Sequence, residues 1–519
     1  MKELLKKCKG SPVAIALFGV LLIYFVYICI INLSLTPSFY CTDMYSDVLY
    51  AVRAWETKSI FPDGWVFGNQ FYVIATPVLA SLLYGVIGHP AMAMAIASIL
   101  MTVGVILSFL WMLKSVFPRI EERLIGVLGF IVLTSLAGNV VVGINGWQLF
   151  FTMCSYYACY IITAFICFGV FLRRREELTG PRIAMLVIAI ILSFCTGMQS
   201  LRQTVIMLPA MLAIEGIEQF AYLKKFKRLE KQPLIITMAI SVANLIGLGV
   251  VRFLNIPQNE YFSYTGFLSI RELPASIVEC LMNMAKLLTG KQHFITILLV
   301  VAITAVSVIR LLLKKEDSRC STLVALFIIS VLCFGIVDVF TNMTVRSIYY
   351  FMLFPLVSIS LSYVFRYWKL GKGIVLALLA VLVIISFKTS ILPVVNTALE
   401  ADSDISYEIS DMMIEKGYTT IYSGWNQCED IAIVSGGKIT AGFWNVYDDV
   451  FNPVMYLCDP VVYEEESSKC VYYLKKDNRD IALEQAQKKG VTMTLVVEYP
   501  EEEIWLYEAS ENLMQMSLK

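Results

Sequence analysis

Charged residues are scarce in this chain. Of its 519 residues only 16% are charged and 58% are hydrophobic, whereas average soluble domains carry about 25% charged residues. Basic and acidic residues are equal in number, at 41 each, so the net charge indicates no class of partner. Only two histidines occur, which argues against a histidine-based metal site. These shortages exclude an ordinary soluble protein and favour a membrane protein.

Motifs of soluble enzymes are also missing. The sequence has no P-loop, no GxGxxG after a predicted strand, no HExxH and no GxSxG. Without a nucleotide-binding loop, an ATP-driven pump is disfavoured. The 13 cysteines form no CxxC pair, and those within apolar runs are expected to pack as small hydrophobic residues. Cys458 and Cys470 could form a disulfide if their compartment is oxidising.

Apolar runs of about twenty residues, long enough to cross a bilayer, recur along the chain. The first run follows four lysines within residues 2–9 and is too long for a cleaved signal, so we interpret it as a retained signal anchor. We predict about eleven spans, at residues 13–33, 91–113, 124–142, 149–172, 183–197, 204–219, 234–251, 294–313, 323–340, 349–365 and 374–394.

The basic loops determine the predicted orientation, because cytoplasmic loops are enriched in Lys and Arg. If the further apolar stretch 71–87 does not span, the basic clusters all fall on one side, at residues 114–123, 173–182, 224–231, 314–319 and 366–372. We therefore predict a cytoplasmic N-terminus. We expect residues 71–88 to form a helix that lies in the outer interface or re-enters the membrane, bent at Pro77 in its middle.

The last part of the chain differs in pattern, because short strand and helix signals alternate there. We predict helices at 402–416, 428–434 and 479–489, and strands at 419–422, 438–443, 470–474, 491–498 and 503–507. The predicted fold class is thus a polytopic α-helical membrane domain, residues 1–395, with a small C-terminal α/β domain, residues 396–519, outside the membrane. An external loop, residues 34–70, joins the first span to the interfacial helix.

The external loop is the richest polar segment of the chain. On a helix Asp43 and Asp47 are four residues apart and share one face, which also carries Tyr50. A partly desolvated carboxylate at the membrane surface can act as general base for a hydroxyl acceptor. The alternative is a solvated loop whose acidic residues have no catalytic role.

This arrangement resembles the GT-C fold of membrane glycosyltransferases, which includes protein O-mannosyltransferases and lipid A aminoarabinose transferases. The shared features are an acidic residue soon after the first span, an aromatic loop, an interfacial helix, many spans and a soluble C-terminal domain. The family has an Asp or Asp-Glu in this loop, which Asp43 or Asp47 matches, and we favour Asp47 because it precedes Tyr50 and Trp55. The His-Pro-Pro that often opens the interfacial helix is replaced by Gly-Asn-Gln-Phe-Tyr at 68–72.

The resemblance implies transfer of a sugar from a polyprenyl-phosphate donor to an acceptor hydroxyl on the outer face, the acceptor being a lipid, a glycan or a protein. An Asp would take the acceptor proton, and an Arg would stabilise the departing phosphate. Arg202 and Arg346 are the candidate phosphate-binding residues, and interfacial anchoring is the alternative for each. The candidate substrate-binding residues are Tyr50, Trp55, Asp338 and Gln199.

Asp338 is a candidate because an ionisable group within an apolar span is costly and therefore suggests function. Its structural alternative is a salt bridge to Arg346. Acidic residues at 448–449 and 464–466 are most simply explained as a solvated surface, with a divalent cation or an acceptor as the alternative ligand. No metal site and no nucleic-acid partner are predicted.

Two other function classes stay open at this point. A transporter or flippase would place its site near the bilayer midplane on broken helices, often in two related halves, and no such halves are visible. A non-catalytic protein of envelope assembly would share the predicted topology. The predicted location is a bacterial plasma membrane, with the endoplasmic reticulum membrane as the alternative.

Overall fold

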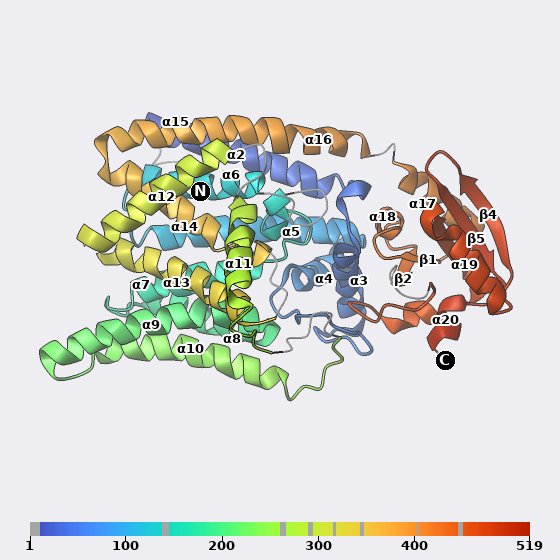
Figure 1. The fold of residues 1–519 in the computed structure, drawn as a ribbon, viewed down its shortest axis with the longest axis horizontal. Coiled ribbons are helices and arrows are strands. Elements are labelled where there is room, and N and C mark those ends of the chain that lie inside the picture. The colour runs from blue at the N-terminus through green and yellow to red at the C-terminus, as the bar shows by residue number, and fades with distance from the viewer. Residues whose placement is uncertain are drawn as a thin grey trace.

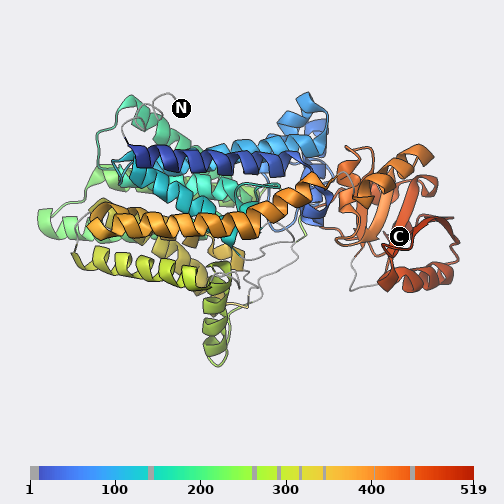
Figure 2. The ribbon, with the colours of Figure 1, turned by 90° about the horizontal axis from the view of Figure 1, so that it is seen from above.

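The computed structural model describes residues 11–137, 145–259, 266–288, 294–314, 318–342, 347–401, 404–444 and 450–518. Most helices run side by side along the long axis, and a β-sheet with its own helices lies at one end (Figure 1). Figure 2 shows the same separation, with α11 (Leu273–Leu288) projecting from the side of the helical bundle. We call the end of the bundle next to the sheet the sheet end. The opposite end, which includes Lys114, Arg173 and Lys227, is the basic end.

Eight helices of the described residues are long and apolar enough to cross a membrane, so the chain is a multi-pass membrane protein. They are α2 (Pro12–Leu33), α5 (Pro90–Leu113), α8 (Gly180–Gln199), α9 (Leu201–Phe226), α10 (Lys231–Val251), α13 (Ser318–Phe340), α14 (Leu353–Tyr367) with the turn before it, and α15 (Lys369–Ser386) with its continuation α16 (Leu392–Leu399). The three other predicted spans overlap α6 (Ile120–Leu136), α7 (Ala158–Leu172) and α12 (Phe294–Lys314), and residues 138–142 of the predicted span 124–142 lie outside the described residues.

Within the stretch 71–88 the structure has a helix that is shorter than expected, and its interfacial position stays a prediction. It is α4 (Thr76–Ile87), about 18 Å long, too short for a bilayer core of about 30 Å. Pro77 lies in its first turn and not in its middle, because the first turn is where the missing N–H of proline costs nothing. The preceding residues 71–75 are not helical. Leu82 and Val86 are 62% and 87% exposed, as expected for a helix that lies against lipid.

The predicted span at 149–172 is also corrected, because its first nine residues are irregular and only α7 is helical. The irregular backbone is held by buried polar side chains: Asn32 donates to the Phe151 carbonyl at 2.9 Å and accepts from the Met153 N–H at 3.0 Å. Thr102 donates to the same Phe151 carbonyl. Irregular backbone at membrane depth is tolerated where protein groups satisfy it. Apolar composition alone does not reveal such a segment.

Helices α8 and α10 approach closely because each has a glycine at the contact. A Cβ at Gly197 would lie 2.2 Å from the Asn244 carbonyl oxygen, and one at Gly247 would lie 2.1 Å from that of Phe194. Small residues allow membrane helices this approach, and the Asn244 amide adds a 2.8 Å hydrogen bond to the Ser193 carbonyl. The pair fixes the end of α8 that reaches the sheet end.

The C-terminal part is a five-stranded mixed sheet of order β2-β1-β3-β5-β4, as the predicted α/β pattern requires. Strands β1, β2 and β3 are parallel, and β5 pairs antiparallel with β3 and β4. In chain order the elements are α17 (Ile405–Lys416), β1 (Thr420–Gly424), α18 (Glu429–Val434), β2 (Thr440–Trp444), β3 (Cys470–Lys475), α19 (Lys476–Lys488), β4 (Met493–Tyr499), β5 (Ile504–Ala509) and α20 (Leu513–Leu518). The predicted fold class is thereby confirmed.

The sheet part is docked on α3 (Thr42–Thr57), a helix within the external loop. The Thr42 N–H donates to the Asn426 side chain, and the Asn426 N–H donates to the Thr42 hydroxyl, both at 2.9 Å. The Tyr45 hydroxyl accepts from the Ala441 N–H at 2.7 Å. At the other end of α3, Arg53 forms an ion pair with Asp459. These contacts fix α3 between the membrane helices and the sheet.

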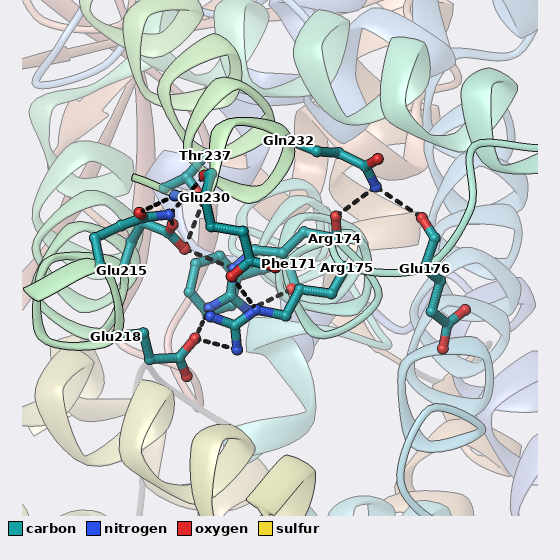
Figure 3. A network of polar contacts seen from close by, with 10 residues as sticks. Phe171, Arg174, Arg175, Glu176, Glu215, Glu218, Glu230, Gln232 and Thr237 are labelled. Carbon is teal, nitrogen blue, oxygen red and sulfur yellow. Dashed lines mark hydrogen bonds and ion pairs between the residues drawn. The ribbon is translucent and has the colours of Figure 1, made fainter. Parts of the chain in front are cut away.

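A buried ion-pair network ties the helices together at the basic end. Figure 3 shows side chains from α7, α9 and α10 meeting around Arg174. The Arg174 guanidinium donates to Glu215 at 2.6 Å and to Glu218, and the side chains of Arg174 and Glu215 are 4% and 3% exposed. The Gln219 amide donates to Glu215 at 2.6 Å. Charges this deeply buried are tolerated only because they are paired and hydrogen-bonded.

We expect Arg174→Met to destabilise the protein by about 3–5 kcal/mol, because it leaves Glu215 buried without its cation. The double variant Arg174→Met/Glu215→Gln should recover part of the loss, since it removes the unpaired charge. Arg175, whose side chain is 44% exposed in its own ion pairs, is the matched control, and Arg175→Met should cost about 1 kcal/mol or less. Thermal unfolding midpoints in detergent check the order. Equal losses for the two single variants would contradict it.

Candidate active site

Helix α3 places the two predicted carboxylates at the sheet end. It begins after Cys41, and Asp43 lies in its first turn, where the positive end of the helix dipole favours an acidic residue. Asp47 follows one turn later on the same face, as the spacing predicts. Asp43 is half-buried, whereas Asp47 is only 2% exposed. The two carboxylates therefore differ in environment despite their shared face.

Asp47 is held by Tyr72, whose hydroxyl donates to its carboxylate. Burial raises the pKa of Asp47 from 3.8 to about 8, the Tyr72 hydrogen bond opposes that shift, and the charge of Asp43 adds to it. A carboxyl with a pKa of about 8 is mostly protonated at neutral pH. The surroundings of Asp47 therefore favour its neutral, hydrogen-bonded form.

Arg202 lies at the start of α9 among aromatic rings. Ser200 caps the helix by accepting from the Arg202 N–H at 3.1 Å. The guanidinium carbon lies 4.5 Å from the ring centre of Tyr349 and 4.9 Å from that of Tyr157, within the range of cation–π attraction. No carboxylate of the described residues forms an ion pair with Arg202. Within the described part of the chain, the Arg202 guanidinium is therefore held by aromatic rings and not by a carboxylate.

Tyr456, from the segment between β2 and β3, shares the electrostatic environment of the carboxylates. Burial raises the pKa of Tyr456, and the charges of Asp43, Tyr349 and Asp47 add to the shift. A Cβ at Gly68 would lie 2.7 Å from the Tyr456 ring, so only a glycine fits beneath it. The sequence analysis did not identify Tyr456, because no local pattern marks a residue brought in from the C-terminal part.

The arrangement of helices and sheet matches a solved structure. The chain is similar to the crystal structure of ArnT from Cupriavidus metallidurans bound to undecaprenyl phosphate, over 95% of this chain and 98% of that one, with a TM-score of 0.51 and 9% sequence identity. The chain has the fold of ArnT. ArnT is a GT-C polyprenyl-phosphate glycosyltransferase, so the predicted resemblance to the GT-C fold is confirmed. No protein-family model and no curated protein matches the sequence.

Within this ArnT-like fold, Gln199 holds the segment that carries Tyr72. Its side-chain oxygen accepts from the N–H groups of Val73 at 3.1 Å and Ile74 at 2.6 Å, and its backbone carbonyl accepts from the Phe71 N–H at 3.0 Å. Gln199 is only 2% exposed. Gln199 therefore fixes the backbone on both sides of Tyr72.

Tyr50 and Trp55 also pack within the protein. The Tyr50 hydroxyl donates to the Ile60 carbonyl at 2.7 Å, and its ring contacts that of Tyr72 at 4.7 Å between ring centres. The Trp55 ring fills the space beside Gly85 of α4, where a Cβ would lie 2.2 Å from it. Tyr50 thus borders Tyr72, the partner of Asp47, whereas Trp55, about two turns beyond Asp47 on α3, joins α3 to α4.

Asp338 lies on α13 and is engaged by Tyr350, whose hydroxyl donates to its carboxylate at 2.6 Å. Its backbone carbonyl accepts from the Ser276 hydroxyl of α11 at 3.1 Å. Arg346, the second predicted phosphate-binding residue, lies outside the described residues, as do residues 448 and 449.

No group of three or more His, Cys, Asp or Glu residues in the described parts of the chain could hold a metal ion. Cys458 and Cys470 are both free thiols and form no disulfide. The Cys470 sulfur instead lies 3.1 Å from the Glu466 carbonyl oxygen.

Two buried carboxyls should make stability depend on pH. Burial raises the pKa of both Asp47 and Glu429 to about 8. Because the folded state favours their neutral forms, the stability they contribute is complete below about pH 4 and is lost as the pH rises to 8. We expect the unfolding midpoint of Asp47→Asn/Glu429→Gln to fall less with rising pH than that of the parent. Each kcal/mol of stability that the variant keeps corresponds to about 2–4 °C in unfolding midpoint.

The matched control for this pH dependence is Asp63→Asn/Glu501→Gln, which changes two exposed carboxyls. Unfolding midpoints measured between pH 5 and pH 8 should fall equally in the parent and in this control. An equally steep fall in the Asp47→Asn/Glu429→Gln variant would show that these carboxyls are not neutral in the folded protein.

Proposed function

We propose that the chain is a GT-C-type glycosyltransferase that moves a sugar from a polyprenyl-phosphate donor to an acceptor hydroxyl. The observation that carries the proposal is an ArnT-like fold whose sheet end holds the two α3 carboxylates and, at the start of α9, Arg202. ArnT is bound to undecaprenyl phosphate in its crystal structure, a lipid of the proposed donor class. The basic end is cytoplasmic by the positive-inside rule, which puts the reaction on the outer face.

Asp43 is the proposed general base. A base must reach the proton that it abstracts, and half-buried Asp43 is accessible where the 2% exposed Asp47 is not. In the sequence, the aromatic residues that follow Asp47 favour Asp47 as the base. Burial favours Asp43 instead. In the reaction, the acceptor oxygen attacks the anomeric carbon while its proton moves to the Asp43 carboxylate. The bond from the anomeric carbon to the phosphate oxygen breaks, and the phosphate leaves with the electron pair.

Arg202 is proposed to stabilise that leaving group. Negative charge on the phosphate increases as the bond breaks, so a preplaced cation binds the transition state more tightly than the ground state. The tyrosine rings hold the guanidinium in position before the substrate arrives. Arg suits the role because it can bind two phosphate oxygens at once.

Asp47 and Tyr72 support the base from behind. A neutral Asp47 limits charge repulsion with the Asp43 carboxylate, because two adjacent carboxylates do not both carry charge readily. Tyr72 keeps Asp47 in place, and Gln199 holds the backbone beside Tyr72. Tyr50, Tyr456 and Asp338 are the proposed borders of the substrate site, and the acceptor's chemical class is a matter for the assay.

Purified protein in nanodiscs, incubated with a panel of polyprenyl-phosphate sugars, tests the function. We expect one donor to be consumed, with sugar appearing on a lipid, glycan or protein acceptor supplied in the mixture. Donor that binds but is not consumed with any acceptor would indicate a non-catalytic protein. Failure of every donor to bind would overturn the proposal, and movement of labelled donor across sealed vesicles would then favour a flippase.

A further inference from the structure

A second polar cavity lies at the basic end, far from the candidate active site. It has a volume of about 340 Å³, and its lining includes Lys114, Arg173 and Arg182. Lys114 ends α5, whose other end contacts the sheet part through His89 and Pro90. With 24 residues α5 is about 36 Å long, enough to cross a bilayer core of about 30 Å. The cavity therefore opens at the membrane surface opposite the sheet.

Positive charge dominates the lining of this cavity. Among the described residues, five basic side chains and one acidic side chain, that of Glu176, line it. Arg174 is already neutralised by Glu215 and Glu218. The two oxygens of Glu176 pair with Arg182 at 2.6 Å and Arg319 at 2.8 Å. Among the described residues, neither Lys114 nor Arg173 forms an ion pair, so these two cations supply the positive charge of the cavity on which the inference rests.

Arg173 is the most firmly positioned of these cations. Its guanidinium lies 4.3 Å from the Trp111 ring centre and donates to the Trp111 carbonyl at 2.8 Å and the Gly169 carbonyl at 3.0 Å. The neighbouring backbone is fixed by Gln232, whose amide donates to the Arg174 and Glu176 carbonyls (Figure 3). A pre-positioned guanidinium in a basic cavity is a binding arrangement for phosphate.

The rest of the lining is apolar. Leu178, Met185, Leu186 and Ile236 share the cavity with the cations, and Leu178 is 42% exposed. Trp111 adds an aromatic ring at the depth where tryptophan is enriched in membrane proteins. A basic wall beside an apolar wall matches a molecule with a phosphate at one end and hydrocarbon at the other. Basic pockets between membrane helices on the cytoplasmic side commonly take such headgroups.

We propose that this cavity binds the phosphate headgroup of an anionic membrane lipid in the leaflet opposite the sheet. The recognised chemistry is a phosphate ester, and the apolar wall selects one that is attached to lipid over free phosphate. A bound headgroup would offset repulsion among the cations and join α5, α7, α8 and α13 at their ends. This site is separate from the proposed transfer reaction, and binding can be measured without any donor.

The test uses the full-length protein in a neutral detergent, with phosphatidylglycerol, phosphatidylcholine and inorganic phosphate as probes. Native mass spectrometry measures bound lipid, and the thermal unfolding midpoint measures stabilisation. The test variant is Lys114→Gln/Arg182→Gln. The control is Arg228→Gln/Lys231→Gln, which removes two exposed charges from the α9–α10 turn at the same end, outside the cavity lining. We expect phosphatidylglycerol to bind the test variant about thirtyfold more weakly than the parent, with the control unchanged.

Three results would overturn the proposal. Equal weakening in test and control variants would show only general surface attraction. Equal stabilisation of the parent by inorganic phosphate and by phosphatidylglycerol would indicate a site for free phosphate. Equal binding of phosphatidylcholine would show that no anionic headgroup is recognised. If the double variant does not fold, Arg173→Lys decides, because it keeps the charge but removes the Trp111 stack. Loss of the hydrogen bonds to the Trp111 and Gly169 carbonyls should lower the lipid-free unfolding midpoint. The folded protein should also bind phosphatidylglycerol more weakly than the parent, and unchanged binding would overturn the proposal.

Discussion

Replacing Asp43 by Asn is expected to lower the rate of sugar transfer by about 10²–10⁴-fold, the usual contribution of a general base. The amide has nearly the same shape as the carboxylate but cannot accept the acceptor's proton. Donor affinity should stay at the parent value, because the proposed donor contact is Arg202. Single-turnover rates and equilibrium binding of the donor, measured on the same preparation, separate the two effects.

Asp63→Asn is the matched control for Asp43→Asn. Asp63 belongs to the same external loop and is exposed, so its replacement should leave the transfer rate unchanged. Asp47→Asn should lower the transfer rate less than Asp43→Asn does. The amide that replaces the Asp47 carboxyl can still accept the hydrogen bond from the Tyr72 hydroxyl. If Asp47→Asn abolished transfer while Asp43→Asn preserved it, the roles of the two residues would be exchanged.

The architecture was largely predictable because its determinants are local. Apolar runs mark the spans, and short alternating elements mark the sheet. Gly417 and Gly490 end the predicted helices, each with a positive φ, of 83° and 74°, that glycine adopts without strain. The irregular residues before α7 were not predictable, since their backbone partners Asn32 and Thr102 come from other helices. The start of α4 was misplaced for a similar reason, because Gln199 holds the preceding residues extended.

The candidate site was only half predictable from the sequence. The four-residue spacing of Asp43 and Asp47 correctly placed both on one face of a helix. Their different burial was not visible, because it depends on Tyr72 and on the docked sheet. Tyr456 lies in the C-terminal part, and no spacing rule connects it with α3. Long-range packing therefore decides which of two similar carboxylates is accessible.

Replacing Arg202 by Gln is expected to lower kcat/KM for transfer by about 10²–10³-fold, as loss of a preorganised charge-stabilising donor does. The amide keeps some hydrogen-bonding ability but has no charge for the departing phosphate. Affinity for polyprenyl phosphate itself should fall about tenfold or more, because that product carries the same phosphate. Initial rates over a range of donor concentrations, together with binding titrations of polyprenyl phosphate, measure the two quantities.

Arg202→Lys distinguishes a positioned guanidinium from a mere positive charge. Lysine keeps the charge, but it cannot bind two phosphate oxygens in one plane or lie flat between Tyr157 and Tyr349. We therefore expect an activity between those of the parent and Arg202→Gln. Arg252→Gln, which removes an exposed cation from the sheet end of α10, should have no effect. If Arg202→Gln matched the parent while Arg346→Gln lost donor binding, the phosphate contact would belong to Arg346, and Arg202 would serve only to hold the tyrosine rings together.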